Sequence, residues 1–374
     1  MAKKKTTKKK SSTKKKSSKK KSSKKKSSSK KKSSKKKSSK KKSSKKSEEE
    51  VVEVNDPFAT LQYNVDDLPG VGAATLRKLK GAGYDTLQAL VTIPPSIIQE
   101  DCGLGEKTTE KIVPAAREAL DLTYESAEEV WEKRKSIARV TTSSKNIDEL
   151  LGGGIETGGI TELFGEYRTG KTQICHQVCV NVQKPESDGG IDGNALYIDT
   201  EGTFRPERLI QIAEGEGMDP RKVLKRVFTA RAYNSHHQTI LIKDAHQKIA
   251  EHNIKVVVVD SLISHFRSEY VGRGTLANRQ QLLNKHIHDL HRLSSIYPDL
   301  AVIVTNQVQS KPDVFFGDPT RATGGNIVAH AATTRTYLRK GKGEQRVMKM
   351  IDSPNLPEGE AIFVITEGGI RDPD

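Results

Sequence analysis

The octapeptide GEYRTGKT at residues 165–172 decides the fold that we expect of this chain. It matches in full the pattern G-x-x-x-x-G-K-[S/T], whose two glycines let the backbone curl so that its N–H groups face phosphate oxygens. The apolar run ITELF precedes it at residues 160–164, and a helical pattern follows over residues 172–183. A helix N-terminus adds partial positive charge at the same place. Strand, loop and helix together predict a nucleotide-phosphate site; the alternative is a glycine-rich turn that only precedes a helix.

Two side chains of this loop carry the chemistry of such a site. Lys171 is expected to reach the β- and γ-phosphates, and the Thr172 hydroxyl to hold Mg²⁺. A second ligand of the metal should come from the end of a buried strand. Asp260 closes the apolar run at residues 256–259 and fits that place.

Attack on the γ-phosphate also needs a group that orients water. Glu201 follows the expected strand at residues 195–199, and the carboxyl ends of parallel strands face the ligand crevice of an open α/β sheet. We therefore favour Glu201 as the base. Asp199 is the competitor, because it lies at the strand end and could serve the structure instead.

Apolar strands alternate with amphipathic helices beyond residue 140, which predicts an α/β fold with a mostly parallel central sheet between helices. Further strands joined by Gly and Pro turns are expected between residues 333 and 370. The expected strands are residues 160–164, 195–199, 223–229, 256–260 and 301–305, and the expected helices are residues 172–183, 206–216, 236–252 and 276–295.

The formal net charge of +17 is unevenly distributed along the 374 residues. Residues 1–46 hold 26 of the 64 basic residues and no acid, which leaves 38 basic against 47 acidic residues, a net charge of −9, for residues 47–374. A Lys/Ser-rich arm with no apolar residue beyond Met1 and Ala2 cannot form a core, so we expect a disordered basic tail over residues 1–50. One interpretation of this tail is a non-specific tether to DNA; the alternative is a solvated tail without a binding role.

The rest of the chain divides by composition into three parts. Short helices broken by glycine turns predict a small all-α domain at residues 55–120, and a charged linker at residues 121–139 precedes the core at residues 140–374. The charged N-terminus and the lack of a long apolar run argue against secretion and membrane insertion. Cys102, Cys175 and Cys179 do not form a disulfide or zinc pattern, and neither do the histidines near residue 288. We expect an intracellular soluble protein.

The motifs together resemble the RecA-type strand-exchange recombinases, in particular the archaeal RadA branch and its eukaryotic homologues. The most specific block is YIDTEGTFRPER at residues 197–208, and the terminal TEGGIRD at residues 366–372 looks archaeal. The matching segments follow the family order from about residue 55 to residue 371: residues 165–177, 197–208, 270–274, 305–308 and 356–360.

The resemblance implies a DNA repair and homologous recombination protein. Such a protein binds single-stranded DNA as an ATP-dependent helical filament, pairs it with homologous double-stranded DNA, and exchanges strands with DNA-dependent ATP hydrolysis. It implies a RecA-like P-loop ATPase core with a helix–hairpin–helix N-terminal domain, and ATP and Mg²⁺ as cofactors. It also implies a homo-oligomer (filament or ring), recombination mediator proteins as partners, no membrane, and a cytoplasmic, nucleoid-associated location.

Residue by residue, the resemblance assigns Lys171 and Thr172 to phosphate and magnesium, Glu201 to water activation and Gln307 to sensing the γ-phosphate. The expected catalytic residues are thus Lys171, Glu201 and Gln307, and the expected metal ligands are Thr172 and Asp260. The resemblance implies that adenine stacks on Arg208. The nucleotide-binding residues would be Gly165, Glu166, Tyr167, Arg168, Thr169, Gly170, Lys171, Thr172, Gln173 and Arg208. The residues that cap the nucleotide of a neighbouring subunit would be His330, Asp352, Ser353 and Pro354.

Two glycine-rich segments, residues 267–279 and 309–326, are expected to be loops that contact DNA. Arginines suit phosphates, and apolar side chains beside cations suit stacking on bases; ordinary surface loops are the alternative. A third candidate is a helix–hairpin–helix turn at residues 69–72, whose amides can face a phosphate. The expected DNA-binding residues are Arg267, Arg273, Arg279, Lys311, Phe315, Phe316, Arg321, Gly324, Gly325, Gly70 and Gly72.

The linker carries Tyr-Glu-Ser-Ala at residues 124–127, where the family has an aromatic-x-x-Ala segment that docks on the next protomer. The family usually has Phe here, and the hydroxyl of Tyr124 needs a partner or water. Tyr124 and Ala127 would then anchor self-assembly beside the edge strand near residues 228–232. A plain amphipathic linker is the alternative.

Three other functions compete with an ATP-dependent recombinase. They are a non-hydrolysing regulatory paralogue, a hexameric RecA-fold helicase, and a nucleic-acid-coating protein that acts through its basic arm. The combination of Lys171, Glu201, Asp260 and Gln307 argues against the first. The aromatic-x-x-Ala linker and the block at residues 197–208 argue against the second.

Overall fold

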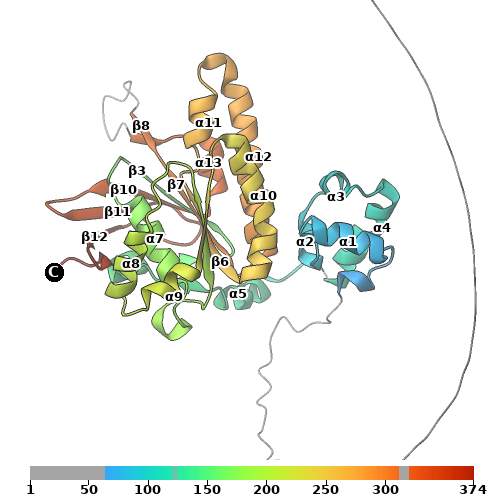
Figure 1. Ribbon diagram of the computed structural model, residues 1–374, viewed down its shortest axis with the longest axis horizontal. Coiled ribbons are helices and arrows are strands. Elements are labelled where there is room, and N and C mark those ends of the chain that lie inside the picture. Colours follow the sequence, from blue (N-terminus) through green and yellow to red (C-terminus); the bar gives the residue numbers. More distant parts are fainter. Residues whose placement is uncertain (1–63, 121, 123, 311–319) are drawn as a thin grey trace, which may run out of the picture. The chain divides into compact units, whose positions relative to one another are not determined.

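The computed structural model describes the chain from residue 64 onwards, except residues 121, 123 and 311–319 (Figure 1). The Lys/Ser-rich arm therefore lies outside the described residues, as do Lys311, Phe315 and Phe316 of the expected second DNA loop.

A nine-stranded sheet forms the centre of the core in the described part of the chain. The strands β10, β3, β7, β6, β4 and β5 lie side by side in this order and run parallel. Beyond β10, the strands β11, β12 and β13 continue the sheet with antiparallel pairing. The mostly parallel sheet that the strand–helix alternation predicts is thus confirmed. In spatial order the strands are β13 (Gly369–Arg371), β12 (Glu360–Thr366), β11 (Gln345–Asp352), β10 (Thr334–Lys340), β3 (Ile160–Gly165), β7 (Ala301–Asn306), β6 (Ile254–Asp260), β4 (Asn194–Asp199) and β5 (Val227–Arg231).

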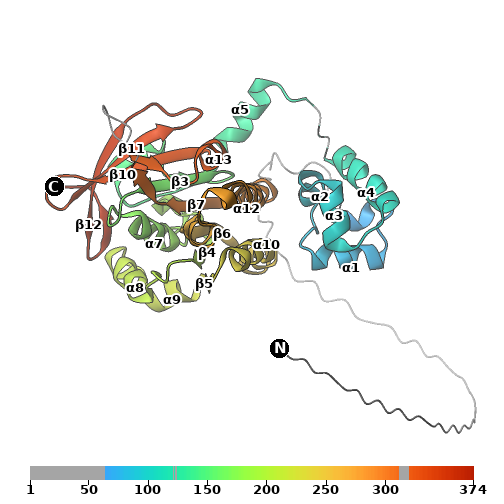
Figure 2. The same cartoon turned by 90° about the horizontal axis from the view of Figure 1, so that it is seen from above.

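Helices cover both faces of this sheet, as Figure 2 shows. Successive side chains of a strand point to opposite faces. Accordingly, Val256 and Val258 of β6 pack in one cluster with α7, α8 and α9, while Val257 and Val259 pack in another with α10, α11, α12 and α13. The helices on the first face are α7 (Lys171–Asn181), α8 (Pro206–Gly215) and α9 (Pro220–Lys225). Those on the second are α10 (Ser235–His252), α11 (Ser264–Glu269), α12 (Leu276–Ile296) and α13 (Asn326–Ala331).

Three expectations about local structure are wrong. The strand expected at residues 223–229 begins only at Val227, because Asp219 caps α9 through the amides of Arg221 and Lys222. The loop expected at residues 267–279 is mostly helical, since α11, the 3-10 turn η3 (Arg273–Thr275) and α12 occupy it. The ends of the loop expected at residues 309–326 pair as the antiparallel strands β8 (Val308–Ser310) and β9 (Thr320–Ala322).

The N-terminal helices form a small all-α unit with buried residues of their own, such as Leu79, Leu90 and Ile112. Gly70 has φ +93°, a conformation that favours glycine, and the helix α1 begins just after Gly72. The unit comprises η1 (Val65–Asp67), α1 (Ala73–Gly81), α2 (Leu87–Thr92), α3 (Pro95–Cys102) and α4 (Glu106–Ala119).

The linker contains a short helix, α5 (Ala127–Lys135). A capping box starts it: the Glu129 amide donates to the Ser126 hydroxyl, and the Glu129 carboxylate accepts from the Ser126 amide. None of its residues is buried. The remaining elements are β1 (Arg139–Val140), α6 (Lys145–Leu150), β2 (Ile155–Glu156) and η2 (Glu186–Asp188). Among the described helices, none has the length and apolarity needed to span a bilayer.

Candidate nucleotide and catalytic site

A cavity of about 880 Å³ opens at the carboxyl ends of β3, β6 and β7. This volume lies within the usual range of about 300–1,000 Å³ for small-molecule sites. The lining residues are Gly165, Glu166, Tyr167, Arg168, Thr169, Gly170, Lys171, Thr172, Gln173, Glu201, Thr203, Asp260, Ser261, Thr305, Gln307, Val308 and Lys340. The structure therefore brings together all three residues expected to be catalytic and both expected metal ligands.

The loop between β3 and α7 requires both of its glycines. A Cβ on Gly165 would clash with the Leu338 carbonyl oxygen of the neighbouring strand. Gly170 has φ +107° and directly precedes the first residue of α7. These constraints curl the backbone so that the helix N-terminus faces the cavity, which suits an anionic phosphate group.

Lys171 lies at that N-terminus, and its ammonium group donates to the carbonyl oxygens of Gly165 (2.9 Å) and Glu166 (2.8 Å). Burial lowers its pKa, and the carboxylates of Asp260 and Glu201 act in the opposite direction. A partly buried cation of this kind gains from a close anion, because the interaction is screened less than at the surface.

Asp260 is buried and accepts hydrogen bonds from three hydroxyl groups. The donors are Thr172 (2.8 Å), Tyr197 (2.6 Å) and Thr305. Burial raises the pKa of Tyr197 well above its usual value, so its hydroxyl remains a donor. The carboxylate of Asp260 and the hydroxyl of Thr172 are hard oxygen ligands beside the phosphate loop, and they fit Mg²⁺, which commonly binds one or two carboxylates together with phosphates.

Asp199, the competitor of Glu201, organises the loop that carries Glu201. Its Oδ1 accepts from the backbone amides of Glu201 (3.1 Å), Gly202 (2.7 Å) and Thr203 (3.1 Å). The Asp199 carboxylate therefore serves to hold the backbone of the loop. Glu201, in contrast, lines the cavity. The geometry favours Glu201 as the residue that faces a nucleotide.

The Glu201 carboxylate is oriented by two donors that directly follow the strands β6 and β7. Its Oε1 accepts from the Ser261 hydroxyl (2.7 Å) and from Nε2 of Gln307 (2.9 Å). On its other side, the Gln307 amide oxygen lies 3.5 Å from the guanidinium of Arg267. Gln307 therefore lies between the expected base and an expected DNA-binding residue.

A buried polar chain at the end of β7 joins Asn306 to β3, to Gln307 and to Thr323. Asn306 donates to the Glu162 carboxylate (2.8 Å) and to the carbonyl of Thr323 (2.7 Å), and its Oδ1 accepts from the Gln307 amide (2.8 Å). Arg335 pairs with Glu162 (2.7 Å). Asn306, Glu162 and Arg335 were not predicted from the sequence, although a glutamate inside the apolar run ITELF could have drawn attention to them.

Arg208, which the family resemblance assigns to adenine, lies outside the cavity lining but next to it. Its Nε donates to the side chain of Gln173 (2.7 Å), which does line the cavity. Its Nη atoms donate to the carbonyls of Thr366, the last residue of β12, and of Glu367, which follows it. The guanidinium plane is thus held between α7 and the C-terminal hairpin.

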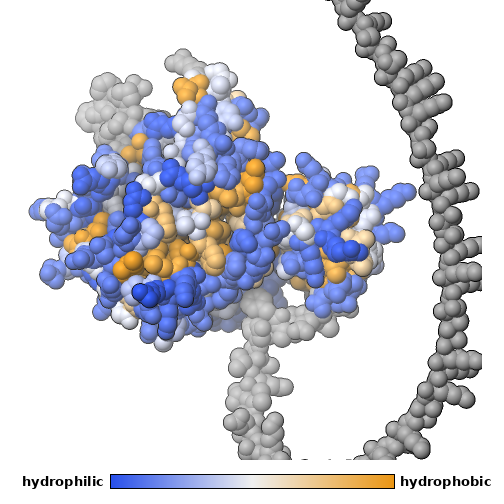
Figure 3. All heavy atoms as spheres, in the orientation of Figure 1, coloured by the Kyte–Doolittle hydropathy of each residue, from blue (hydrophilic) through white to orange (hydrophobic). Residues whose placement is uncertain are grey.

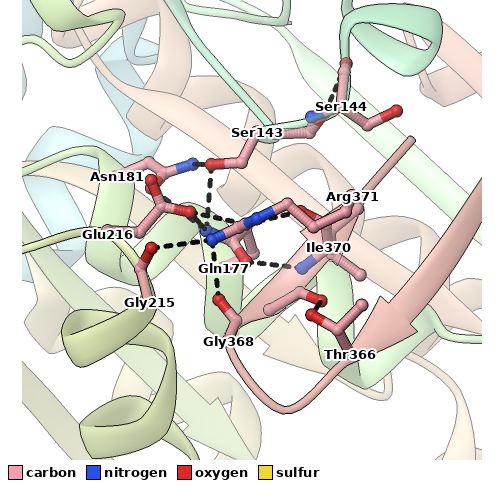
Figure 4. Close-up of polar contacts among 12 residues, drawn as sticks. Ser143, Ser144, Gln177, Asn181, Gly215, Glu216, Thr366, Gly368, Ile370 and Arg371 are labelled. Carbon is pink, nitrogen blue, oxygen red and sulfur yellow. Dashed lines mark hydrogen bonds and ion pairs between the residues drawn. The ribbon is translucent and has the colours of Figure 1, made fainter. Parts of the chain in front are cut away.

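A second polar cluster fastens α7 to the C-terminal strand (Figure 4). Gln177 donates to Ser143 (3.1 Å) and Glu216 (2.9 Å), and its carbonyl oxygen accepts from the Ile370 amide (2.9 Å). Arg371 forms an ion pair with Glu216 (2.7 Å). This cluster was not predicted either, because its members are far apart in the chain.

The four residues expected to cap a neighbouring nucleotide do not line the cavity of their own chain. His330 of α13 lines a separate cavity of about 290 Å³ with His288 and His291. Asp352 ends β11 and is exposed, and Ser353 and Pro354 follow it in the connection to β12. Their expected role therefore requires a second copy of the chain.

The expected DNA-binding residues that the structure describes are distributed over several elements. Arg267 is exposed on α11, Arg279 is half-buried on α12, Arg273 lies in η3 and Arg321 in β9. Gly324 (φ +102°) and Gly325 (φ +68°) form the turn before α13.

The N-terminal unit contains two similar glycine hairpins. Gly70 and Gly72 precede α1, and Gly103 (φ +56°) and Gly105 precede α4 in the same way. Only the first was predicted to be a hairpin of the helix–hairpin–helix type. The repeated spacing of two glycines before a helix could have revealed the second.

Cys102, Cys175 and Cys179 are buried and unpaired, and burial raises the pKa of each thiol. In the described ranges, no group of three or more His, Cys, Asp or Glu side chains is arranged to hold a metal ion.

Comparison with known proteins gives two family matches and close relatives. The model of the Rad51 family matches residues 133–373, and that of the SAM-like helix-hairpin-helix tandem matches residues 64–118. The "DNA repair and recombination protein RadA" of Aeropyrum pernix is 52% identical over 311 residues, which cover 83% of this chain and 97% of the relative. The protein of the same name from Metallosphaera sedula is 51% identical over 309 residues, covering 82% of this chain and 95% of the relative.

Proposed function

The chain belongs to the Rad51/RadA family of recombinases, and from this premise we propose that it is a DNA repair and homologous recombination protein. In this proposal it assembles on single-stranded DNA as an ATP-dependent helical filament, pairs that DNA with a homologous duplex and exchanges strands. ATP hydrolysis is DNA-dependent. The non-hydrolysing paralogue and the helicase are not favoured.

One observation carries the proposal: a single cavity joins the phosphate loop to the contact between Glu201 and Gln307, which in turn reaches Arg267. A non-hydrolysing paralogue would not need an oriented carboxylate opposite the phosphate loop. A change in the position of Arg267 on DNA would move Gln307, and with it the donor that orients Glu201. The arrangement thus offers a physical route from DNA to hydrolysis.

In the proposed reaction the residues of the cavity have separate roles. The loop amides and Lys171 bind and orient the β- and γ-phosphates. Thr172 and Asp260 would hold Mg²⁺, which neutralises charge on the phosphates when it is bound. Glu201 orients water and accepts its proton, and Gln307 holds the Glu201 carboxylate towards the cavity. Arg208 would present its guanidinium plane to the adenine.

We propose that DNA contacts come from the segments on either side of the cavity. Arg267, Arg273 and Arg279 would serve one segment, and Arg321 with the Gly324–Gly325 turn the other. The hairpins of the N-terminal unit would add amide contacts to phosphates without reading the base sequence. Because a chain that acts on DNA must be located where DNA is, we also propose a cytoplasmic, nucleoid-associated location. Recombination mediators remain proposed partners.

Self-assembly would use the edge of the sheet. In the described part of the chain β5 pairs with β4 only, and its Val227, Phe228 and Ala230 are half-buried. Figure 3 shows hydrophobic residues gathered between α9 and α10 on the same face of the core. An open strand edge with apolar surroundings can accept an added strand. Tyr124, which is fully exposed, is the proposed anchor of the segment at residues 124–127.

Replacing Tyr124 by Ala should therefore shift the protein towards monomers. Loss of an aromatic anchor in a pocket costs about 2 kcal/mol, or roughly 30-fold in the association constant. Light scattering across a concentration series measures the shift. Tyr124→Phe, which keeps the ring, should assemble normally, and Leu122→Ala, a change of another exposed residue of the linker, should have little effect. An unchanged particle size for Tyr124→Ala would remove this docking model.

Deleting residues 1–46 should flatten the salt dependence of DNA binding. On single strands the slope of log K against log salt falls by about 0.7 for each phosphate that the protein no longer neutralises. A variant with an uncharged Ser/Gly arm of the same length is the control and should behave like the deletion. Strand exchange should remain. If exchange were abolished, the arm would be part of the mechanism rather than a tether.

The proposed function is tested by ATP turnover of the full-length protein with and without single-stranded DNA in the presence of Mg²⁺. DNA should increase the rate. Turnover that DNA does not change would contradict the proposed coupling, and absence of turnover would favour the regulatory paralogue. Unwinding of a duplex with a single-stranded tail would favour the helicase.

A further inference from the structure

His176 is a buried residue whose ring is fixed between two aromatic residues. It lies in the middle of α7, one turn after Thr172, and is 1% exposed. Its ring stacks on Phe204 at a centroid distance of 5.4 Å and contacts Tyr197 at 5.3 Å. His176 does not line the nucleotide cavity, so it cannot touch a nucleotide there.

Both ring nitrogens of His176 are occupied, and their partners define its protonation. Nδ1 lies 2.7 Å from the carbonyl oxygen of Thr172, which can only accept, so Nδ1 carries the proton. The backbone amide of Arg205, which can only donate, lies 3.3 Å from Nε2, so Nε2 is the acceptor. Burial lowers the pKa of His176, which favours the neutral ring that this pattern requires.

These two bonds join the two halves of the proposed catalytic site. Thr172 supplies a proposed ligand of Mg²⁺, and Arg205 ends the loop that carries Glu201. Asp199 holds most of this loop, because it accepts from the backbone amides of Glu201, Gly202, Thr203 and Phe204. His176 holds the last residue of the loop, Arg205. Of these two anchors, His176 is the one that lies on the helix of the phosphate loop.

We propose that His176 is a positioning residue for ATP hydrolysis: it sets the loop that carries Glu201 at a fixed distance from Thr172, so that the base faces the γ-phosphate. The inference rests on the proposed ATPase function. It predicts that loss of the Nε2 acceptor lowers the rate of hydrolysis while leaving the binding of ATP to Lys171 and the loop amides intact.

Three substitutions distinguish the effect of the two hydrogen bonds of His176 from the effect of its side-chain volume. In His176→Gln the amide oxygen can reach the position of Nε2 and accept from Arg205. In His176→Asn the shorter amide can replace Nδ1 towards Thr172 but cannot reach Arg205. In His176→Phe the ring still packs on Tyr197 and Phe204, but neither bond can form.

The first measurement is kcat and KM for ATP, per folded molecule, in full-length protein with single-stranded DNA. We expect kcat to fall about tenfold or more in His176→Phe and His176→Asn, since the Arg205 amide loses its acceptor and the end of the loop that carries Glu201 loses its anchor. KM should stay within about threefold, because the phosphate contacts remain. His176→Gln should recover most of kcat. A residue that served stability alone would lower the melting temperature but leave kcat per folded molecule unchanged in all three variants, with no advantage for Gln over Asn.

His286→Phe is the matched control. His286 is also fully buried and packs against an aromatic ring, that of Phe266, but it lies on the other face of the sheet. Its replacement should lower stability without changing kcat per folded molecule.

The second measurement is amide hydrogen exchange of residues 200–205 in the nucleotide-free protein, which does not depend on activity. Exchange should be faster in His176→Phe and His176→Asn than in the parent and in His176→Gln. If the parent protein did not hydrolyse ATP, the proposed function would fail while exchange still tested the positioning. Unchanged exchange in His176→Phe, or equal loss of kcat in the Gln and Asn variants, would overturn the inference.

Discussion

Lys171→Ala is expected to weaken ATP binding by more than 100-fold. The ammonium group is the cation of the phosphate loop, and its two present partners, Gly165 and Glu166, are carbonyl groups of that loop. Charge-assisted hydrogen bonds contribute about 1.5–3 kcal/mol each, so removing the bonds to two phosphates costs at least about 3 kcal/mol. Titration calorimetry with ATP and Mg²⁺ measures the change.

The control for this prediction is Lys145→Ala. Lys145 is exposed on α6 and does not line the cavity, so its removal changes the net charge equally without touching the site. ATP binding should be unchanged in this variant. Normal turnover in Lys171→Ala would disprove the assignment of the phosphate site.

Glu201→Gln is expected to lower the rate of ATP hydrolysis by about 10²–10⁴-fold while ATP binding and filament assembly persist. The amide oxygen of glutamine can still accept from Ser261 and Gln307, so the loop should keep its position. Only the base is removed. Single-turnover hydrolysis, together with nucleotide binding on the same sample, measures both quantities.

Glu207→Gln provides the matched control for this change. Glu207 lies in the first turn of α8, is exposed and does not line the cavity. Its replacement should leave hydrolysis near the parent rate. Loss of nucleotide binding in Glu201→Gln would mean that Glu201 serves another role.

The strand, loop and helix around residues 165–172 could be predicted because each depends on neighbouring residues. The apolar run of β3, the two glycines and the helical pattern all lie within about 25 residues. The same holds for Asp260, since a carboxylate at the end of an apolar strand lies at the ligand edge of a parallel sheet. Local sequence patterns were therefore sufficient to predict most of the residues that line the cavity.

The contacts within the polar chain from Arg335 to Asn306 could not be predicted, because they depend on strand register. Arg335 of β10 pairs directly with Glu162 of β3, and Asn306 ends the strand on the other side of β3. These positions meet only once the order of the strands is known. The contact of His176 could not be predicted for the same reason, because its partner Arg205 lies 29 residues further along the chain.

The wrong expectations have local causes that could have been recognised. Asp219 followed by Pro220 is a helix-start pattern, yet the apolar residues after it were interpreted as a strand. Glycines at residues 272 and 274 suggested a long loop, but they occupy only a short break between α11 and α12. The helix-start pattern at residues 219–220 was thus given too little weight, and the glycines at residues 272 and 274 were given too much.

The most direct test of the proposed function is strand exchange by the full-length protein with single-stranded DNA, a homologous duplex, ATP and Mg²⁺. Joint molecules should form with the homologous duplex and not with a duplex of unrelated sequence. ATP turnover and normal filaments without joint molecules would show that the protein does not exchange strands.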